Sequence, residues 1–124
     1  VVSFNGFVLL VGQVPYEELK TLATDVVRKI EDVRRIYNEL EVGEATSAGA
    51  RTNDTWITTQ VKSKLLASSD TPGRRVKVVT ENSVVYLMGL LTEAEAERVA
   101  LEAAEVGSVE RVVQLFELIP APPI

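Results

Sequence analysis

An internal repeat constrains the fold of this chain more than any other feature of its sequence. With Gly12 aligned on Gly89, an offset of 77, residues 8–12 (VLLVG) match residues 85–89 (VYLMG). Further along, the second copy is one residue shorter and the offset becomes 76. The apolar residues 30, 33, 36 and 40 then align with the apolar residues 106, 109, 112 and 116. We therefore predict that residues 1–43 and 77–119 are two copies of one structural unit.

The first copy reads as two strands, a helix and a closing strand. Strands are predicted over residues 1–4 and 7–12, joined by Asn5-Gly6, a pair that suits a hairpin turn because both positions need positive φ. A helix is predicted over residues 16–30, and a last strand over 33–40. Its predicted core face is the apolar stripe at helical spacing, Leu19, Leu22, Ala23, Val26 and Ile30.

The second copy has the same order, with strands at 76–80 and up to Gly89, a helix at 93–106 and a closing strand at 109–118. Thr92 and Glu95 form a predicted capping box at the start of its helix. One more helix is predicted ahead of this copy, from Asp54 to Ala67, with Asn53 or Asp54 as its N-cap. The second unit is thus α-β-β-α-β.

The sequence predicts an α+β fold of two small sandwiches, each with helices on one face of a three-stranded mixed sheet. The predicted domains are residues 1–43 and 53–119, with a small and polar linker at 44–52 and a Pro-rich tail at 120–124. The first copy has no counterpart of the leading helix, which leaves half of its sheet face uncovered. We expect either that a leading segment lies outside these residues or that another copy of the chain covers this face.

Composition argues for a folded, non-enzymatic protein. The chain of 124 residues is 46% hydrophobic and 25% charged, with a net charge of −5 and neither Cys nor His. These absences exclude thiol nucleophiles, Ser–His triads and Cys-containing zinc sites, and the negative charge argues against nucleic acid as a partner. No catalytic residue, metal site or cofactor site is predicted. The carboxylates of the last helix are interpreted as a solvated face: Glu93, Glu95, Glu97, Glu102 and Glu105.

The helix at 54–67 carries the candidate site. At 100° per residue, Ile57, Val61 and Leu65 share the core face. The opposite face collects Trp56, Thr59, Lys62, Ser63 and Leu66, together with Ala67. A tryptophan and a leucine on an outward face with a cation between them suggest an interface, and tryptophan suits the lipid headgroup region.

The charges are unevenly distributed along the chain. Residues 51–77 hold six basic side chains against two carboxylates, whereas residues 78–119 hold two against eight. A basic region around Trp56 favours an anionic surface. From the residues alone the alternative stays open that Trp56 packs against the linker or the other unit and belongs to the core.

The repeat resembles the BON domain family. The resemblance rests on residues 8–14 (VLLVGQV) with 33–38 (VRRIYN), and on residues 84–90 (VVYLMGL) with 109–112 (VERV). The stretch 53–62 (NDTWITTQVK) is similar to the second domain of tandem-BON periplasmic lipoproteins of Gram-negative bacteria. The resemblance covers residues 1–119.

This resemblance implies a non-enzymatic protein of the periplasm, held at the inner leaflet of the outer membrane by a lipidated cysteine. It implies that the second domain binds anionic phospholipid such as phosphatidylglycerol, and that the protein supports envelope integrity and localises to the division site. The lipid-binding residues would be Trp56, Thr59, Lys62, Ser63 and Leu66. The chain departs from the family in having no cysteine and no first leading helix.

Two other functions remain as alternatives. The same patch, or the uncovered sheet of the first copy, could dock an envelope protein. The uncovered sheet also predicts self-association of the chain. A hydrolase using acidic residues would need two carboxylates that converge in a pocket, and nothing in the spacing predicts such a pair.

Overall fold

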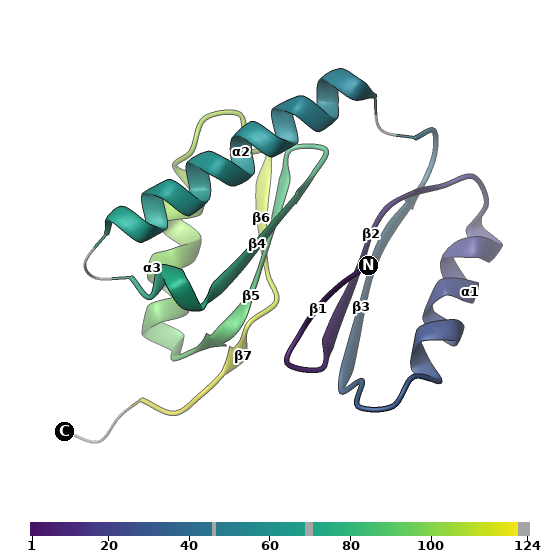
Figure 1. Cartoon of the computed structure of the whole chain (residues 1–124), viewed down its shortest axis with the longest axis horizontal. Coiled ribbons are helices and arrows are strands. Elements are labelled where there is room, and N and C mark those ends of the chain that lie inside the picture. The colour runs from purple at the N-terminus through teal and green to yellow at the C-terminus, as the bar shows by residue number, and fades with distance from the viewer. Residues whose placement is uncertain (46, 69–70, 122–124) are drawn as a thin grey trace. The chain divides into compact units, whose positions relative to one another are not determined.

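The computed structural model describes residues 1–45, 47–68 and 71–121. The chain divides into two compact units, Val1–Ser47 (unit 1) and Ala48–Ile124 (unit 2). In each unit the helices lie on one face of a β-sheet (Figure 1). This arrangement confirms the predicted α+β class with helices on one face of a mixed sheet.

Unit 1 is built on a three-stranded sheet in the order β1-β2-β3. Strand β1 (Val2–Phe4) pairs antiparallel with β2 (Phe7–Val14), and β2 pairs parallel with β3 (Arg35–Val42). The turn between β1 and β2 has φ of 50° at Asn5 and 82° at Gly6, as the Asn-Gly pair predicts. Among the described residues of unit 1, helix α1 (Glu17–Arg28) is the single helix.

The face that α1 turns to the sheet differs from the predicted one. Val27 is buried and packs with Ala23 against a cluster that includes Val8, Leu10 and Leu40. The Asn38 side chain of β3 fixes this orientation, because its Nδ2 donates to the Lys20 carbonyl at 2.7 Å and to Thr24 Oγ1 at 2.6 Å.

Four of the five core positions predicted for the helix at 16–30 are exposed, and α1 itself ends at Arg28. They are Leu19, Leu22, Val26 and Ile30, so the prediction was wrong for them and holds only for Ala23, which is partly buried. The stripe lies on the flank of α1, beside the face that Asn38 draws onto the sheet. The periodicity indicates one continuous apolar stripe. It does not indicate which residues of the stripe pack against the sheet.

Unit 2 has a second sheet of the same design. Strand β4 (Val76–Glu81) pairs antiparallel with β5 (Val84–Leu91), and β6 (Arg111–Gln114) and β7 (Glu117–Leu118) both pair parallel with β5. The predicted closing strand at 109–118 is therefore divided into two short strands. Helices α2 (Ala48–Ala67) and α3 (Glu93–Ala104) pack against the sheet and each other, around a core that includes Ile57, Val61, Leu65, Val85, Leu87 and Val99.

The start of α3 follows the predicted capping box. The Glu95 backbone N–H donates to Thr92 Oγ1, and the Thr92 N–H donates to a Glu95 carboxylate oxygen at 3.0 Å. The Thr92 backbone hydrogen bond and the guanidinium of Arg75 lower the pKa of Glu95 below its ordinary value. The stabilisation by this carboxylate is therefore present above the unfolded-state pKa and is lost as pH falls through the lowered pKa.

Several predicted boundaries need correction. Helix α2 begins at Ala48, so residues 48–52 of the predicted linker at 44–52 are helical, and neither Asn53 nor Asp54 is an N-cap. Strands β2 and β5 continue past Gly12 and Gly89 to Val14 and Leu91. Of the predicted tail, residues 122–124 lie outside the described residues.

The two glycines of the repeat motif are needed for different reasons. Gly12 has φ of +123°, a conformation that L side chains rarely adopt. Gly89 sits where a Cβ would lie 2.6 Å from the Arg75 carbonyl oxygen, so it permits close approach of β5 to the chain entering β4. The same sequence motif therefore meets two different steric requirements in the two units.

We expect Gly89→Ala to lower the free energy of unfolding of unit 2 by about 2 kcal/mol, because the added methyl group meets backbone that cannot rotate away. Gly107→Ala is the matched control, since a Cβ at Gly107 meets no atom within 4 Å. Urea denaturation of the two variants measures the difference. Equal midpoints would contradict the steric account of Gly89.

Candidate functional site

Helix α2 presents one apolar face to the core of unit 2. Ile57, Val61 and Leu65 recur every fourth residue and are fully buried against the sheet and α3. This spacing places three branched side chains in one row along the helix. The row fixes the rotation of α2 about its axis, and with it the set of side chains that face solvent.

Asp54 lies on this inner face and is 6% exposed. Its Oδ2 accepts from the Asn82 N–H and its Oδ1 from the Ser83 N–H, both at 2.8 Å. These two amides belong to the turn between β4 and β5, where both residues have positive φ. Asp54 therefore joins α2 to the hairpin. Sequence reasoning missed this role, although Asp54 falls on the wheel beside Ile57 and Val61.

The outer face of α2 carries the five predicted site residues, and all five are exposed. Trp56 is 48% and Leu66 is 58% exposed, large fractions for such apolar side chains. Thr59, Lys62 and Ser63 lie on the same face between them. We call Trp56, Thr59, Lys62, Ser63 and Leu66 the outer face of α2.

The hydroxyl groups on α2 are not equivalent as hydrogen-bonding partners. Thr59 Oγ1 donates to the Thr55 carbonyl at 3.0 Å, and Thr55 and Thr52 donate in the same way to Arg51 and Ala48. A threonine that donates to the carbonyl four residues earlier keeps only acceptor capacity for a ligand. Thr59 is therefore oriented to accept a hydrogen bond from a ligand rather than to donate one to a phosphate.

Ion pairs neutralise part of the basic region. Lys64 pairs with Glu105 at 2.9 Å, and Arg75 pairs with Glu95 while also donating to the Leu90 carbonyl. Within the described ranges, Lys62 and Arg74 meet no carboxylate at ion-pair distance. The positive charge available to a ligand near α2 is thus smaller than the count of basic residues suggested.

A shallow groove continues the outer face at the C-terminal end of α2. It has a volume of about 230 Å³ and is lined by Leu65, Leu66, Thr71, Pro72, Gly73, Arg74 and Arg75. The chain runs close to the helix here, since a Cβ at Gly73 would lie 2.7 Å from the Leu65 carbonyl. The groove brings Arg74 to the side of Leu66. The helical spacing of α2 could not predict Arg74 as part of the site, because Arg74 lies beyond the C-terminal end of this helix.

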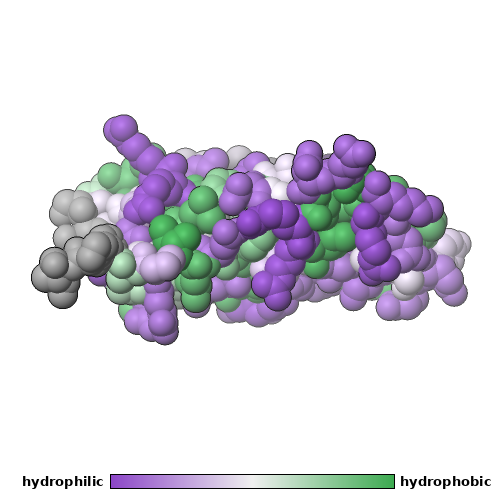
Figure 2. Space-filling view, turned by 90° about the horizontal axis from the view of Figure 1, so that it is seen from below, coloured by the Kyte–Doolittle hydropathy of each residue, from purple (hydrophilic) through white to green (hydrophobic). Residues whose placement is uncertain are grey.

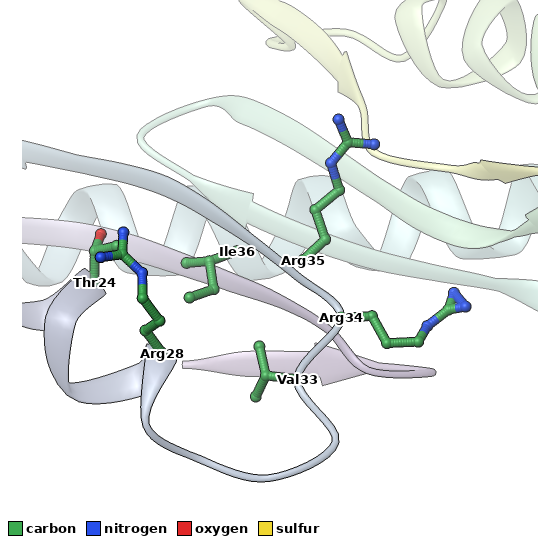
Figure 3. A pocket seen from close by; sticks show the side chains of 6 residues that line it. All are labelled: Thr24, Arg28, Val33, Arg34, Arg35 and Ile36. Carbon is green, nitrogen blue, oxygen red and sulfur yellow. The ribbon is translucent and has the colours of Figure 1, made fainter.

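A second hollow, in unit 1, gathers three arginines but does not form an anion site. It is lined by Thr24, Arg28, Val33, Arg34, Arg35 and Ile36, and the three guanidinium groups point in different directions (Figure 3). Arg34 lies over the Phe7 ring at 4.9 Å and Arg35 over the Tyr37 ring at 5.4 Å, whereas Arg28 is 3.6 Å from Asp25. Each arginine therefore has a partner within the unit.

The described residues contain neither a metal-binding cluster nor a membrane-spanning helix. No group of three or more Asp and Glu side chains within residues 1–45, 47–68 and 71–121 could hold a metal ion. In the same ranges, none of the helices has the length and apolar character needed to cross a bilayer.

On the face shown in Figure 2, hydrophobic surface forms separate patches between hydrophilic side chains. Apolar patches with polar borders are typical of interaction surfaces.

Comparison with known proteins connects this architecture to a family. The BON domain matches residues 1–44 and 53–120. The chain is 40% identical over 116 residues to the outer membrane lipoprotein DolP of Haemophilus influenzae, covering 94% of this chain and 60% of that protein. It is 41% identical over 119 residues to the 21 kDa hemolysin of Actinobacillus pleuropneumoniae, covering 96% and 61%.

A third relative, the osmotically-inducible protein Y of Escherichia coli, is 34% identical over 115 residues, covering 90% of this chain and 54% of that protein. The chain thus spans between about half and three fifths of the length of these relatives. The matched residues include every strand of both sheets and most of α2. This chain belongs to the BON domain family, and it carries two BON domains in tandem.

Proposed function

We propose that this chain is the non-enzymatic membrane-binding part of an envelope lipoprotein, and that it binds anionic phospholipid through the outer face of α2. The observation that carries the proposal is the exposure of Trp56 and Leu66 on a helix whose opposite face is fully buried. Both side chains can enter a bilayer surface without any rearrangement of the core. The similarity to an outer membrane lipoprotein supports a location in the cell envelope. Within the envelope, the proposed location is the periplasm, at the inner leaflet of the outer membrane.

The chemistry of the outer face suits an anionic headgroup. Lys62, which no described carboxylate neutralises, would meet phosphate, and Ser63 would donate its hydroxyl to the same group. Thr59 would accept from a headgroup hydroxyl, such as those of the glycerol in phosphatidylglycerol, because its own proton is held by Thr55. Arg74 adds a second cation beside Leu66. Each cation near an anionic bilayer is worth about 1 kcal/mol.

A single helix face of this size binds weakly on its own. Stable attachment of the full-length protein would require a second signal, such as a lipid anchor on the same polypeptide. The role of α2 would then be to orient an anchored protein on anionic lipid and to concentrate it where such lipid is abundant. Support of envelope integrity and localisation to the division site are proposed on the same basis.

We expect Lys62→Glu to lower affinity for phosphatidylglycerol vesicles by roughly ten- to thirtyfold, because it replaces attraction to phosphate with repulsion. Sedimentation with vesicles at low salt measures the change. Lys29→Glu is the matched control, since it makes the same charge change at an exposed position of unit 1. Equal losses in the two variants would mean that net charge, and not the α2 face, governs binding. A chain that ignores vesicles of any composition would point to docking of an envelope protein on this face.

A further inference from the structure

Strand β3 is an open edge of the unit 1 sheet. Among the described residues it has one neighbouring strand, β2, along all eight of its residues. The corresponding edge of unit 2 is divided, because β6 ends at Gln114 and β7 begins at Glu117. A long unpaired edge offers a row of backbone donors and acceptors to another strand. The last strand of unit 1 therefore has a continuous edge for pairing, and that of unit 2 does not.

The hydrogen bonds at the two ends of β3 show which backbone groups point to this edge. The Arg35 N–H donates to the Gly6 carbonyl at 3.3 Å, and the Gly43 N–H donates to the Val14 carbonyl at 2.9 Å. In a parallel ladder, alternate residues direct both N–H and C=O to the same neighbour, so the odd-numbered residues of β3 face β2. The edge is formed by the backbone groups of the even-numbered residues: Ile36, Asn38, Leu40 and Val42.

The charges along this edge are separated into a basic end and an acidic end. Arg35 lies at the start of β3, and Glu39 and Glu41 lie toward its end. On α1, Arg28 lines the same hollow as Arg35 (Figure 3), and Glu17 begins the helix at the opposite end. Among the described residues, no basic group lies at ion-pair distance from these three glutamates.

Antiparallel pairing with β3 of a second copy makes these charges complementary. The edge groups require even-numbered residues to lie opposite even-numbered residues. With Asn38 opposite Asn38 of the second copy, Arg35 lies opposite Glu41 of that copy, once on each side of a two-fold axis. Shifting the register in one direction places Glu39 opposite Glu39, which is unfavourable for like charges. Shifting it in the other direction leaves Glu41 beyond the end of the ladder.

The same axis brings opposite charges of α1 together. The side chain of Asn38 donates to the Lys20 carbonyl and to Thr24 Oγ1, so the middle of α1 lies over Asn38. The side of α1 at the hollow carries four residues within a sector of about 60° at 100° per residue: Glu17, Thr21, Thr24 and Arg28. When two such helices lie antiparallel about the axis, Glu17 of one copy lies near Arg28 of the other. The two threonines between them are small enough for the helices to approach closely.

We propose that β3 is a self-association edge, through which two copies of this chain pair antiparallel about Asn38 into one continuous six-stranded sheet. Helix α1 of both copies lies on the same face of that sheet. The contact is isologous, because each copy uses the same surface, so it closes at a dimer. In the single chain the Leu40 N–H donates to Asn38 Oδ1 at 3.2 Å, and in the dimer it donates to the Ile36 carbonyl of the second copy. The proposal does not rest on lipid binding by unit 2.

Charge reversal tests this pairing in the 124-residue chain. We expect sedimentation equilibrium to show a reversible dimer that Arg35→Glu or Glu41→Arg weakens by about tenfold or more, because each change places like charges opposite each other twice. The double variant Arg35→Glu/Glu41→Arg restores opposite charges and should regain the original affinity. Lys29→Glu is the matched control for Arg35→Glu, since it makes the same charge change at an exposed position outside the pairing edge.

Hydrogen exchange of the unmodified chain locates the contact without relying on any variant. The Ile36 and Asn38 amides point to the edge, so their protection should rise with protein concentration. The Arg35 and Tyr37 amides face β2, and their protection should change less. A chain that stays monomeric at every concentration, a dimer that the double variant does not restore, or Ile36 and Asn38 amides that exchange equally fast at all concentrations would overturn the proposal.

Discussion

Replacement of Asp54 by alanine is expected to lower the free energy of unfolding of unit 2 by about 3 kcal/mol. The carboxylate is buried and accepts two backbone amides at 2.8 Å. Without it, the Asn82 and Ser83 amides lose their acceptor in a partly buried site. A loss of this size is a large fraction of the stability of a small domain.

Asp54→Asn tests the geometry of this interaction more sharply. An asparagine offers one acceptor oxygen and one NH2 group, so one of the two turn amides would face another donor. We therefore expect Asp54→Asn to retain little of the stability lost in Asp54→Ala. Glu97→Gln, the same chemical change at an exposed position of α3, is the control and should have almost no effect.

Urea denaturation followed by fluorescence measures these changes in unit 2 alone, because the single tryptophan of the chain, Trp56, lies on α2. If Asp54→Ala and Glu97→Gln unfolded at the same midpoint, the attachment of the hairpin to α2 through Asp54 would be refuted.

The second large effect concerns lipid binding. Trp56→Ala is expected to reduce affinity for phosphatidylglycerol vesicles by at least about tenfold, because a half-exposed indole is the largest apolar group that the outer face can insert. The stability of unit 2 should change by no more than about 0.5 kcal/mol, since Trp56 lies outside the core row of α2. Vesicle sedimentation and far-UV circular dichroism measure the two quantities.

Leu101→Ala is the matched control for Trp56→Ala. Leu101 is 66% exposed on α3, so it removes apolar surface from the same unit but from a different helix. Equal losses of vesicle binding in the two variants would show that any exposed apolar side chain of unit 2 contributes. A Trp56→Ala variant that unfolds would show instead that this tryptophan belongs to the core.

Local sequence signals predicted the parts of the fold that depend on short-range chemistry. Asn5-Gly6 predicted the first hairpin because few other residue pairs accept positive φ at both positions. Thr92 and Glu95 predicted the start of α3 because each side chain satisfies a backbone amide of the other. The outward orientation of Trp56 and Leu66 followed from the period of Ile57, Val61 and Leu65, which the sheet and α3 bury.

Features that depend on contacts distant in the sequence were missed. Asp54 was interpreted as a candidate N-cap, because its partners, Asn82 and Ser83, lie 28 and 29 residues away and no local pattern indicates them. The stripe of Leu19, Leu22, Val26 and Ile30 was assigned to the core, because an apolar stripe at helical spacing does not indicate which of its residues pack against the sheet. The residues 48–52 were interpreted as linker from their small size, although they extend α2 at its N-terminus.

The most direct test of the proposed function uses the emission of Trp56 itself. The chain is titrated with vesicles of phosphatidylglycerol, and with vesicles of phosphatidylcholine as the control. We predict a blue shift with phosphatidylglycerol alone that high salt reverses, because Trp56 would enter an anionic bilayer surface beside Lys62. An emission maximum that phosphatidylglycerol vesicles do not move, at low salt and at saturating lipid, would contradict lipid binding through the outer face of α2.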